Sequence, residues 1–200
     1  MNFLAHIYLS SNNELLTIGN FAGDGVRGKN YTRFPIAMQA GIQLHREIDT
    51  FTDAHPIVRK STKRLHKAYG HYSGVIVDIF YDHFLAKNWK NYSDEPLAEY
   101  IDDFYESLIR NLHHLPERFK KMTPIMIEGN WLLSYATIDG IQLVLNGMNR
   151  RTKGRSKMNE ATKELRENYQ AFENDFTLFF KELIEFSTNK RLEIEKRFNL

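Results

Sequence analysis

Apolar residues recur about every 3.6 positions along almost the whole chain, and no stretch alternates apolar and polar residues as a half-buried strand would. Amphipathic helices of this kind bury their apolar stripes against one another. The pattern therefore predicts an all-α fold. With 200 residues and no long linker rich in Gly, Pro or Ser, the chain can build one core. We expect a single compact multi-helix domain over residues 1–200 that ends in a long C-terminal helix.

Proline and glycine residues mark the ends of the expected helices. Pro35 opens one helix, and Pro56 opens the next, which ends at Gly70. The expected helices cover residues 35–52, 56–69, 74–91, 97–115, 124–135, 138–149 and 159–187.

The last of these helices carries an apolar seam whose members follow one another at alternating steps of four and three residues. They are Leu165, Tyr169, Phe172, Phe176, Phe179, Leu183 and Phe186. The first interpretation is a helix that packs on the core of its own chain. The second is a coiled coil that joins two copies into a homodimer.

Bulk properties exclude several classes of protein. The chain has no cysteine, so it has neither disulfides nor thiolate chemistry, which fits a reducing compartment. Its first residues lack the basic and apolar regions of a signal peptide, and no run of about 18 apolar residues could span a membrane. The net charge of +2 is too small to indicate a nucleic-acid binder. We therefore expect a cytoplasmic protein.

His45 and Asp49 lie on one face of the helix expected over 35–52. Four residues advance a helix by about 40°, so their side chains point the same way. Met38, Gly41 and Ile42 share this arc, whereas the ordinary polar residues gather on another side. We expect His45 and Asp49 to point into apolar surroundings.

The helix expected over 74–91 is apolar nearly all round, which is typical of a buried helix. It nevertheless carries Asp78 and Asp82 four residues apart. Two neighbouring buried carboxylates repel each other and lose hydration, which is unfavourable unless a cation compensates. A divalent metal would do so, and carboxylate and imidazole ligands suit Mn, Fe, Mg or Zn.

Two further segments bring candidate ligands. Asp24 lies in the glycine-rich stretch 19–28, where glycines permit close approach of the backbone to a neighbour or ligand. His6 adds a second imidazole. His83 lies about 140° round the helix from Asp78, so it stays open as a ligand, a proton donor or a core residue. The predicted metal ligands are Asp24, His45, Asp49, Asp78 and Asp82.

Each of these residues also has a purely structural interpretation. A histidine on an apolar face can be a hydrogen-bonded core residue, Asp82 can pair with an arginine, and Asp24 can pair with Arg27. These interpretations would all have to hold at once, so we favour the metal site.

Several short motifs in this order resemble the acyl carrier protein phosphodiesterases. They extend from residue 1 to about residue 151 and comprise Met1–His6, Gly19-Asn20, Gly23-Asp24, Val26–Gly28, Gly41-Ile42, Leu44–Arg46, Ile48-Asp49, Phe51–Asp53, His55-Pro56, Asp78, Tyr81–Ala86, Trp89, Val144-Leu145 and Gly147. Ala22 and Gly25 depart from the pattern, because bulkier apolar residues are expected there. The chain after about residue 155 shows no such resemblance.

The resemblance implies a fold, a reaction and a cofactor. The family is distantly related to the all-helical HD superfamily of metal-dependent phosphohydrolases, so we expect an HD-like helical bundle. The implied reaction converts holo-acyl carrier protein to its apo form and 4′-phosphopantetheine. The favoured metal is Mn²⁺, with Mg²⁺ or Fe²⁺ as alternatives. The family's motif positions correspond here to Asp24, His45, Asp49, Asp78, Asp82 and His83.

Such a reaction needs a proton donor and a group that holds the phosphate. We expect His6 or His83 to protonate the leaving serine oxygen, because imidazole titrates near neutral pH. Arg27 or Arg46 is expected to hold the phosphate, with a surface ion pair as the alternative for either.

Acyl carrier proteins are acidic, so the resemblance also implies a basic docking surface. Two groups of cationic residues qualify, one along the helix expected over 56–69 and one in an apparent loop, and either can be a solvated face instead. The first consists of Arg59, Lys60, Lys63, Arg64 and Lys67, and the second of Arg150, Arg151, Lys153, Arg155 and Lys157.

Two other functions remain open at this point. One is an HD-type phosphohydrolase for a nucleotide or another small phosphoester, which would use the same metal and water. The other is a non-catalytic module that binds an acidic helical partner and keeps the buried polar cluster for structure.

Overall fold

The computed structural model describes residues 1–10 and 12–200 and confirms the all-α prediction, since this part of the chain contains helices and no strand. The α-helices are α1 Phe3–Tyr8, α2 Glu14–Ala22, α3 Ile36–Ala54, α4 Pro56–Tyr69, α5 Ser73–Lys87, α6 Leu97–Arg110, α7 Glu117–Glu128, α8 Trp131–Ser134, α9 Ile138–Arg151, α10 Thr162–Glu167 and α11 Tyr169–Phe198. Short 3-10 helices lie between them at Gly23–Gly25 (η1), Gly28–Arg33 (η2), Gly70–Tyr72 (η3), Trp89–Asn91 (η4), Leu112–His114 (η5) and Met158–Glu160 (η6).

The helices bounded by proline and glycine agree best with the prediction. α4 begins at Pro56 and ends at Tyr69, next to Gly70 in a left-handed conformation with φ 53°. The imidazole Nδ1 of His55 accepts a hydrogen bond from the Ile57 amide and so caps this helix. α3 and α5 lie within the predicted ranges to within a few residues at each end.

The helix expected over residues 124–135 is wrong. Pro124 lies inside α7 rather than at a start, and the break comes at Asn130, whose φ of 41° is left-handed. The helix expected over 159–187 is also divided, because the backbone at Asn168 (φ −120°, ψ 25°) separates α10 from α11. α11 then continues to Phe198, eleven residues beyond the predicted end at residue 187. Sequence reasoning missed α1 and α2.

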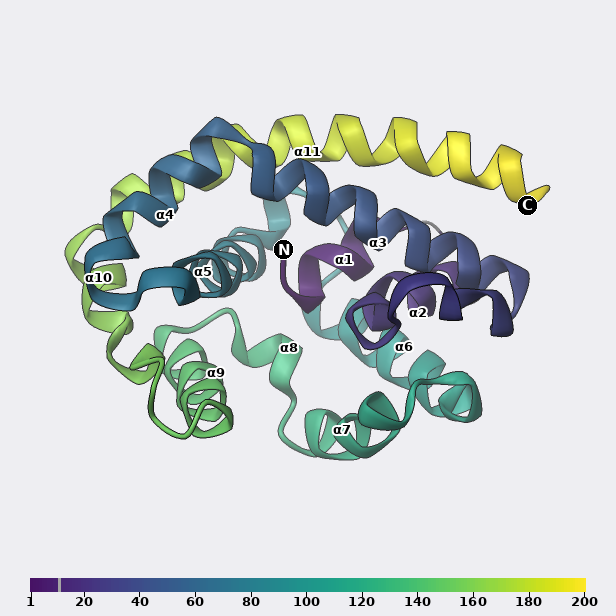
Figure 1. Ribbon diagram of the computed structural model, residues 1–200, viewed down its shortest axis with the longest axis horizontal. Helices are drawn as coiled ribbons and strands as arrows, with labels where there is room; N and C mark the ends of the chain where they lie inside the picture. Colours follow the sequence, from purple (N-terminus) through teal and green to yellow (C-terminus); the bar gives the residue numbers. More distant parts are fainter. Residues whose placement is uncertain (11) are drawn as a thin grey trace.

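The apolar seam, which begins in α10 and continues along α11, belongs to the core of its own chain. Leu165, Phe172, Phe176, Phe179 and Leu183 are fully buried. α11 crosses α3 and α4 along one side of the molecule and also contacts α5 (Figure 1). The face that would join two copies in a coiled coil is therefore occupied within the monomer.

α2 and α3 form the closest helix pair, and two glycines permit their approach. A Cβ atom at Gly41 would overlap the carbonyl oxygen of Leu16, and one at Gly19 would overlap that of Met38. Glycine here serves close approach of two backbones. α1 lies near the middle of the molecule and packs against α2 and α5 (Figure 1), which brings its short sequence next to α3.

No helix in residues 1–10 and 12–200 is long and apolar enough to cross a membrane.

Candidate metal centre

α3 presents His45 and Asp49 on one side, one turn apart, as its periodicity predicts, but the Asp49 side chain is 36% exposed and lies among polar groups rather than in apolar surroundings. His45 is 4% exposed, and its Nε2 lies 3.1 Å from Asp49 Oδ2. Both side chains come from the middle of a 19-residue helix. Their relative position is therefore held by a rigid element.

His6 joins this pair from α1. Its ring stacks on that of His45 with centroids 4.0 Å apart, and its Nε2 lies 3.2 Å from Asp49 Oδ1. That nitrogen is buried but makes no hydrogen bond within the described residues. One ligand atom each from His6, His45 and Asp49 lies within 4.8 Å of the others, which is close enough to hold one metal ion.

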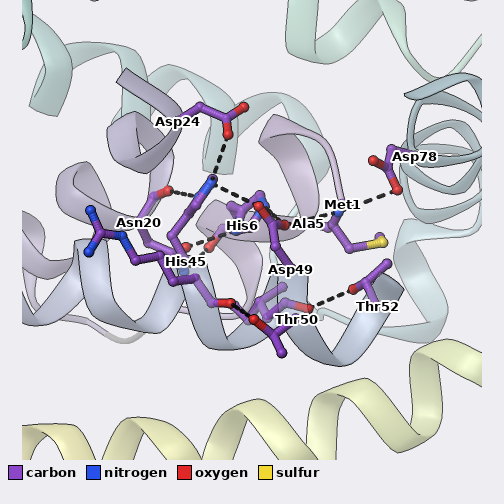
Figure 2. Close-up of polar contacts among 12 residues, drawn as sticks. Met1, Ala5, His6, Asn20, Asp24, His45, Asp49, Thr50, Thr52 and Asp78 are labelled. Carbon is purple, nitrogen blue, oxygen red and sulfur yellow. Dashed lines mark hydrogen bonds and ion pairs between the residues drawn. The ribbon is translucent and has the colours of Figure 1, made fainter. Parts of the chain in front are cut away.

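Asn20 orients both imidazoles. Its side-chain oxygen lies 2.8 Å from His6 Nδ1, and its carbonyl oxygen lies 2.7 Å from His45 Nδ1 (Figure 2). Two acceptors at the Nδ1 atoms place a ring proton on each Nδ1 and direct both Nε2 atoms towards Asp49. Metal-binding histidines in proteins are typically oriented in this way. Sequence reasoning gave Asn20 no role, although an asparagine beside Gly19 in the glycine-rich stretch was the available signal.

Asp24 reaches the centre from η1. Its Oδ1 lies 3.3 Å from His45 Nε2, and its side chain is 66% exposed, so it forms the solvent side of the cluster. A Cβ atom at Gly23 would overlap the His45 ring. Arg46 supports the same segment, because its guanidinium donates to the carbonyls of Val26 at 2.9 Å and Gly28 at 2.8 Å.

Asp78 faces the cluster from α5 on the other side. Its Oδ1 lies 3.4 Å from the Met1 amino group, which also lies 3.3 Å from Asp49 Oδ1 (Figure 2). Asp78 is thus linked to Asp49 through a buried ammonium group rather than through a direct contact.

Asp82 is fully buried, and both of its oxygens accept backbone hydrogen bonds. The donors are the amides of Leu4 at 2.7 Å and Ala5 at 3.1 Å. These amides belong to the first turn of α1 and have no partner inside the helix. Asp82 therefore anchors the helix that carries His6.

His83 and Arg27 lie apart from these contacts. The ring nitrogens of His83 are bonded to the carbonyl oxygen of Tyr135 and to the hydroxyl of Tyr169, each at 2.8 Å. Arg27 is exposed at the end of the Asp24 segment.

The imidazoles differ in protonation. Burial and then the neighbouring His45 lower the pKa of His6 to about 4. Burial also lowers the pKa of His45, but hydrogen bonds to Asp24 and Asp49 outweigh this and raise it to about 9. Burial alone would raise the pKa of Asp49, yet the hydrogen bond from His45 and the charge of the Met1 amino group hold it well below its usual range. The cluster therefore stores one proton on His45 between two carboxylates.

These donors fit a divalent metal ion. Two imidazole Nε2 atoms and a carboxylate converge, the Nε2 of His6 is buried without a hydrogen bond, and Asp24 and Asp78 add negative charge at the edges. Mixed imidazole and carboxylate donors are typical of sites for Mn, Fe and Zn.

Comparison with known proteins now adds the family. The family model described as "Acyl carrier protein phosphodiesterase" matches residues 1–183. The chain belongs to this family.

Individual relatives cover almost the whole chain. A protein of Escherichia coli O6:H1 named acyl carrier protein phosphodiesterase is 34% identical over 193 residues, which is 96% of this chain and 100% of the relative. A protein of the same name from Photorhabdus laumondii is 31% identical over 191 residues, or 95% of this chain and 96% of the relative. One from Shigella boydii serotype 18 is 33% identical over 193 residues. No solved structure matches the chain.

Proposed function

We propose that this protein is a metal-dependent phosphodiesterase that removes 4′-phosphopantetheine from holo-acyl carrier protein. Family membership supports the substrate. The observation that carries the chemistry is the convergence of His6, His45 and Asp49, with two Nε2 atoms facing one carboxylate. A family whose members act on a carrier protein also favours a cytoplasmic location.

The proposed ligand set is His6, His45 and Asp49, with Asp24 and Asp78 completing it from the two sides. Mn²⁺ is the proposed metal, and Mg²⁺ or Fe²⁺ are the alternatives. A bound divalent ion activates water and neutralises charge on phosphoryl oxygens. The role proposed here for Asp82 is to hold α1 in place, because both of its oxygens accept amide hydrogen bonds.

His6 and His83 have different proposed roles. The single ring proton of a metal-bound His6 would be on Nδ1 in the hydrogen bond to Asn20, where it cannot reach the substrate, so we assign His6 to metal binding. Donation by His83 stays a prediction, and its Nε2 would first have to release the Tyr169 hydroxyl.

Arg46 and Arg27 also have different proposed roles. Both hydrogen bonds of Arg46 go to the backbone of the Asp24 segment, which suits a positioning residue. Arg27 is exposed, and we retain the proposal that it binds the phosphate of the substrate.

We place the carrier-protein dock at the end of α9 rather than on α4. On α4, Lys60 and Arg64 form ion pairs with Asp175 of α11 at 2.9 and 2.5 Å, which neutralises part of the stripe. By contrast Arg150, Arg151, Lys153 and Arg155 are all exposed.

Charge reversal at Arg150 and Arg155 should lower kcat/KM for holo-acyl carrier protein at low salt, and the deficit should shrink as salt rises. Undiminished activity would remove this dock.

Mass spectrometry tests the function. Holo-acyl carrier protein incubated with the protein and Mn²⁺ should lose the intact phosphopantetheine group, and addition of EDTA should stop the loss. An Asp49→Asn variant should be inactive. The matched control is Asp53→Asn, one turn further along α3 and exposed, which should keep full activity.

Two outcomes would decide against the proposal. Unchanged holo-protein together with Mn²⁺-dependent hydrolysis of a nucleotide would favour a phosphohydrolase for small substrates. A folded wild type that binds no stoichiometric metal would favour the non-catalytic module. Metal-dependent turnover by a folded Asp78→Ala variant would remove Asp78 from the ligand set.

A further inference from the structure

A groove of about 330 Å³ lies between the start of α3 and the start of α7. One wall consists of Arg33, Phe34 and Pro35, and the opposite wall comes from residues 113–117 and Lys120. Its volume is at the lower end for a pocket that encloses a small molecule. The groove can instead receive a few side chains of a larger partner.

This groove adjoins the segment that carries Asp24. A Cβ atom at Gly25 would lie 3.2 Å from Cβ of Pro116, which belongs to the groove wall, and 2.7 Å from Phe119 Cε2. A bulkier residue at position 25, which the family pattern led us to expect, would push α7 away. The neighbouring Asp24 has its Oδ1 3.3 Å from His45 Nε2 and forms the solvent side of the metal centre. The groove wall therefore contacts the residue next to a proposed metal ligand.

The two elements that form the groove, η2 and the first turn of α7, are rich in cations. Residues 27–33 and 117–121 contain six lysines and arginines but one carboxylate, that of Glu117. Lys120 pairs with this carboxylate at 3.0 Å. The other five cations are exposed, and no carboxylate of the described residues lies within 4.0 Å of them. They are Arg27, Lys29, Arg33, Arg118 and Lys121.

This arrangement fits an acidic protein surface. Unpaired cations repel one another, and carboxylates of a partner relieve that repulsion and steer its approach. Between the cations the groove is lined by Phe34, Pro35 and Leu115, and the next residue of α3, Ile36, is 58% exposed. An apolar centre with a charged rim is typical of protein–protein interfaces. The apolar lining favours a protein over a phosphate backbone.

We propose that this groove and its cationic rim form a docking surface for an acidic protein, which under the proposed function is the carrier protein. The inference rests on the proposed function and adds a second surface to the dock at the end of α9. Because α7 contacts the Asp24 segment through Gly25, a carrier protein bound here lies next to the exposed side of the metal centre.

The test measures binding of apo-acyl carrier protein, which lacks the phosphopantetheine group, to the Mn²⁺-loaded enzyme by isothermal titration calorimetry. The double variant Arg33→Glu/Lys120→Glu should weaken binding about tenfold or more at low salt, and the loss should shrink as salt rises. KM for the holo-protein should rise by a similar factor with little change in kcat. Arg33→Ala/Lys120→Ala should change both in the same direction by less.

The matched control is Lys90→Glu/Lys181→Glu, which changes the net charge equally at two exposed positions outside both docks. It should bind the apo-protein like wild type. All four variants should keep the wild-type Mn²⁺ stoichiometry, because none of the substituted residues touches the metal centre. The alanine pair decides the test if the glutamate pair does not fold.

Wild-type affinity in both groove variants would overturn the inference. An equal loss in the control would also overturn it, because only the overall charge would then matter. An inactive wild type that binds the apo-protein through Arg33 and Lys120 would overturn the proposed function and support the docking surface. An inactive wild type without such binding would overturn both.

Discussion

Asn20 shows how much of the site depends on one uncharged residue. It accepts from His6 through its side chain and from His45 through its backbone, and its Nδ2 donates to the His6 carbonyl at 2.8 Å. The side-chain contacts of Asn20 with His6 form only when α1 packs against α2, because Asn20 lies on α2 and His6 on α1. The residue positions one imidazole with its amide and the other with its main chain.

Replacing Asn20 by alanine should weaken the metal site without removing a ligand. The side-chain contact to His6 would be lost and the backbone contact to His45 kept, so we expect Mn²⁺ affinity to fall about 10–100-fold. Isothermal titration calorimetry measures this directly. Asn30→Ala, at an exposed position, should bind like wild type. An unchanged affinity in folded Asn20→Ala would show that packing alone orients His6.

The protonation of His45 makes stability depend on pH in the metal-free protein. Its pKa is raised from 6.5 to about 9 in the folded state. A group with a raised folded pKa stabilises the fold while it is protonated, so its contribution is complete below about pH 6.5 and lost as the pH rises through about 9. We expect the free energy of unfolding to decrease by up to about 3 kcal/mol across this window.

Urea unfolding of chelator-treated protein at several pH values checks this. A His45→Gln variant should lose most of the dependence. The lowered pKa of His6 changes the free energy of unfolding only below pH 6.5, so His6 does not affect this window. The raised pKa of the Met1 amino group lowers the free energy of unfolding further above pH 8. Stability that rises from pH 6.5 to 9 would contradict the assignment.

At the scale of elements, close contact between α2 and α3 brings Asn20 to His45. Gly19 and Gly41 are the positions where the two backbones meet. The helical pattern of 35–52 predicted the inward face of α3 correctly, but periodicity within one helix carries no information about the helix against which that face packs. The short α1 was missed because six residues are too few to show a period.

A methyl group at Gly41 should separate α2 from α3. Because it would overlap the Leu16 carbonyl, we expect Gly41→Ala to destabilise the fold by about 2–4 kcal/mol and to weaken Mn²⁺ binding. Gly74→Ala is the matched control, since nothing lies within 4 Å of its added Cβ. That helical substitution should be neutral or stabilise by about 0.5–1 kcal/mol. Denaturant unfolding measures both, and equal stabilities would refute the close-contact account.

At the scale of the whole molecule, α11 connects parts of the chain that are far apart in sequence. Asp175 is 3% exposed and accepts from Lys60, Ser61 and Arg64 of α4. Burial would raise the pKa of Asp175, but the hydrogen bonds from Arg64 and Lys60 outweigh it and keep the pKa below its usual value. The apolar seam of the predicted C-terminal helix completes this connection by filling the core.

Removing Asp175 should lower the stability of the entire domain. Asp175→Ala leaves the half-buried Arg64 without its counter-charge, and we expect a loss of about 3–5 kcal/mol and a lower Tm. The control is Asp139→Ala, which removes a 98% exposed carboxylate from an ion pair and should change the free energy of unfolding little. Calorimetry provides the measurement. At a temperature where both variants are folded, their Mn²⁺ affinity should equal that of wild type. A lower Mn²⁺ affinity of Asp175→Ala alone would mean that the contact between α4 and α11 is coupled to the metal centre.

The sequence by itself determined the helical class, the family and the common side of His45 and Asp49, because a helix places residues four apart on one side whatever surrounds it. Only the tertiary structure decided which of the remaining candidates meet that pair. His6 arrives on α1, Asp82 holds α1 instead of facing the cluster directly, and Phe119 of α7 packs on the Asp24 segment because Gly25 leaves room for its ring. Each of these depends on how separate helices pack, and packing is set by the fit of many side chains rather than by the period of any one segment.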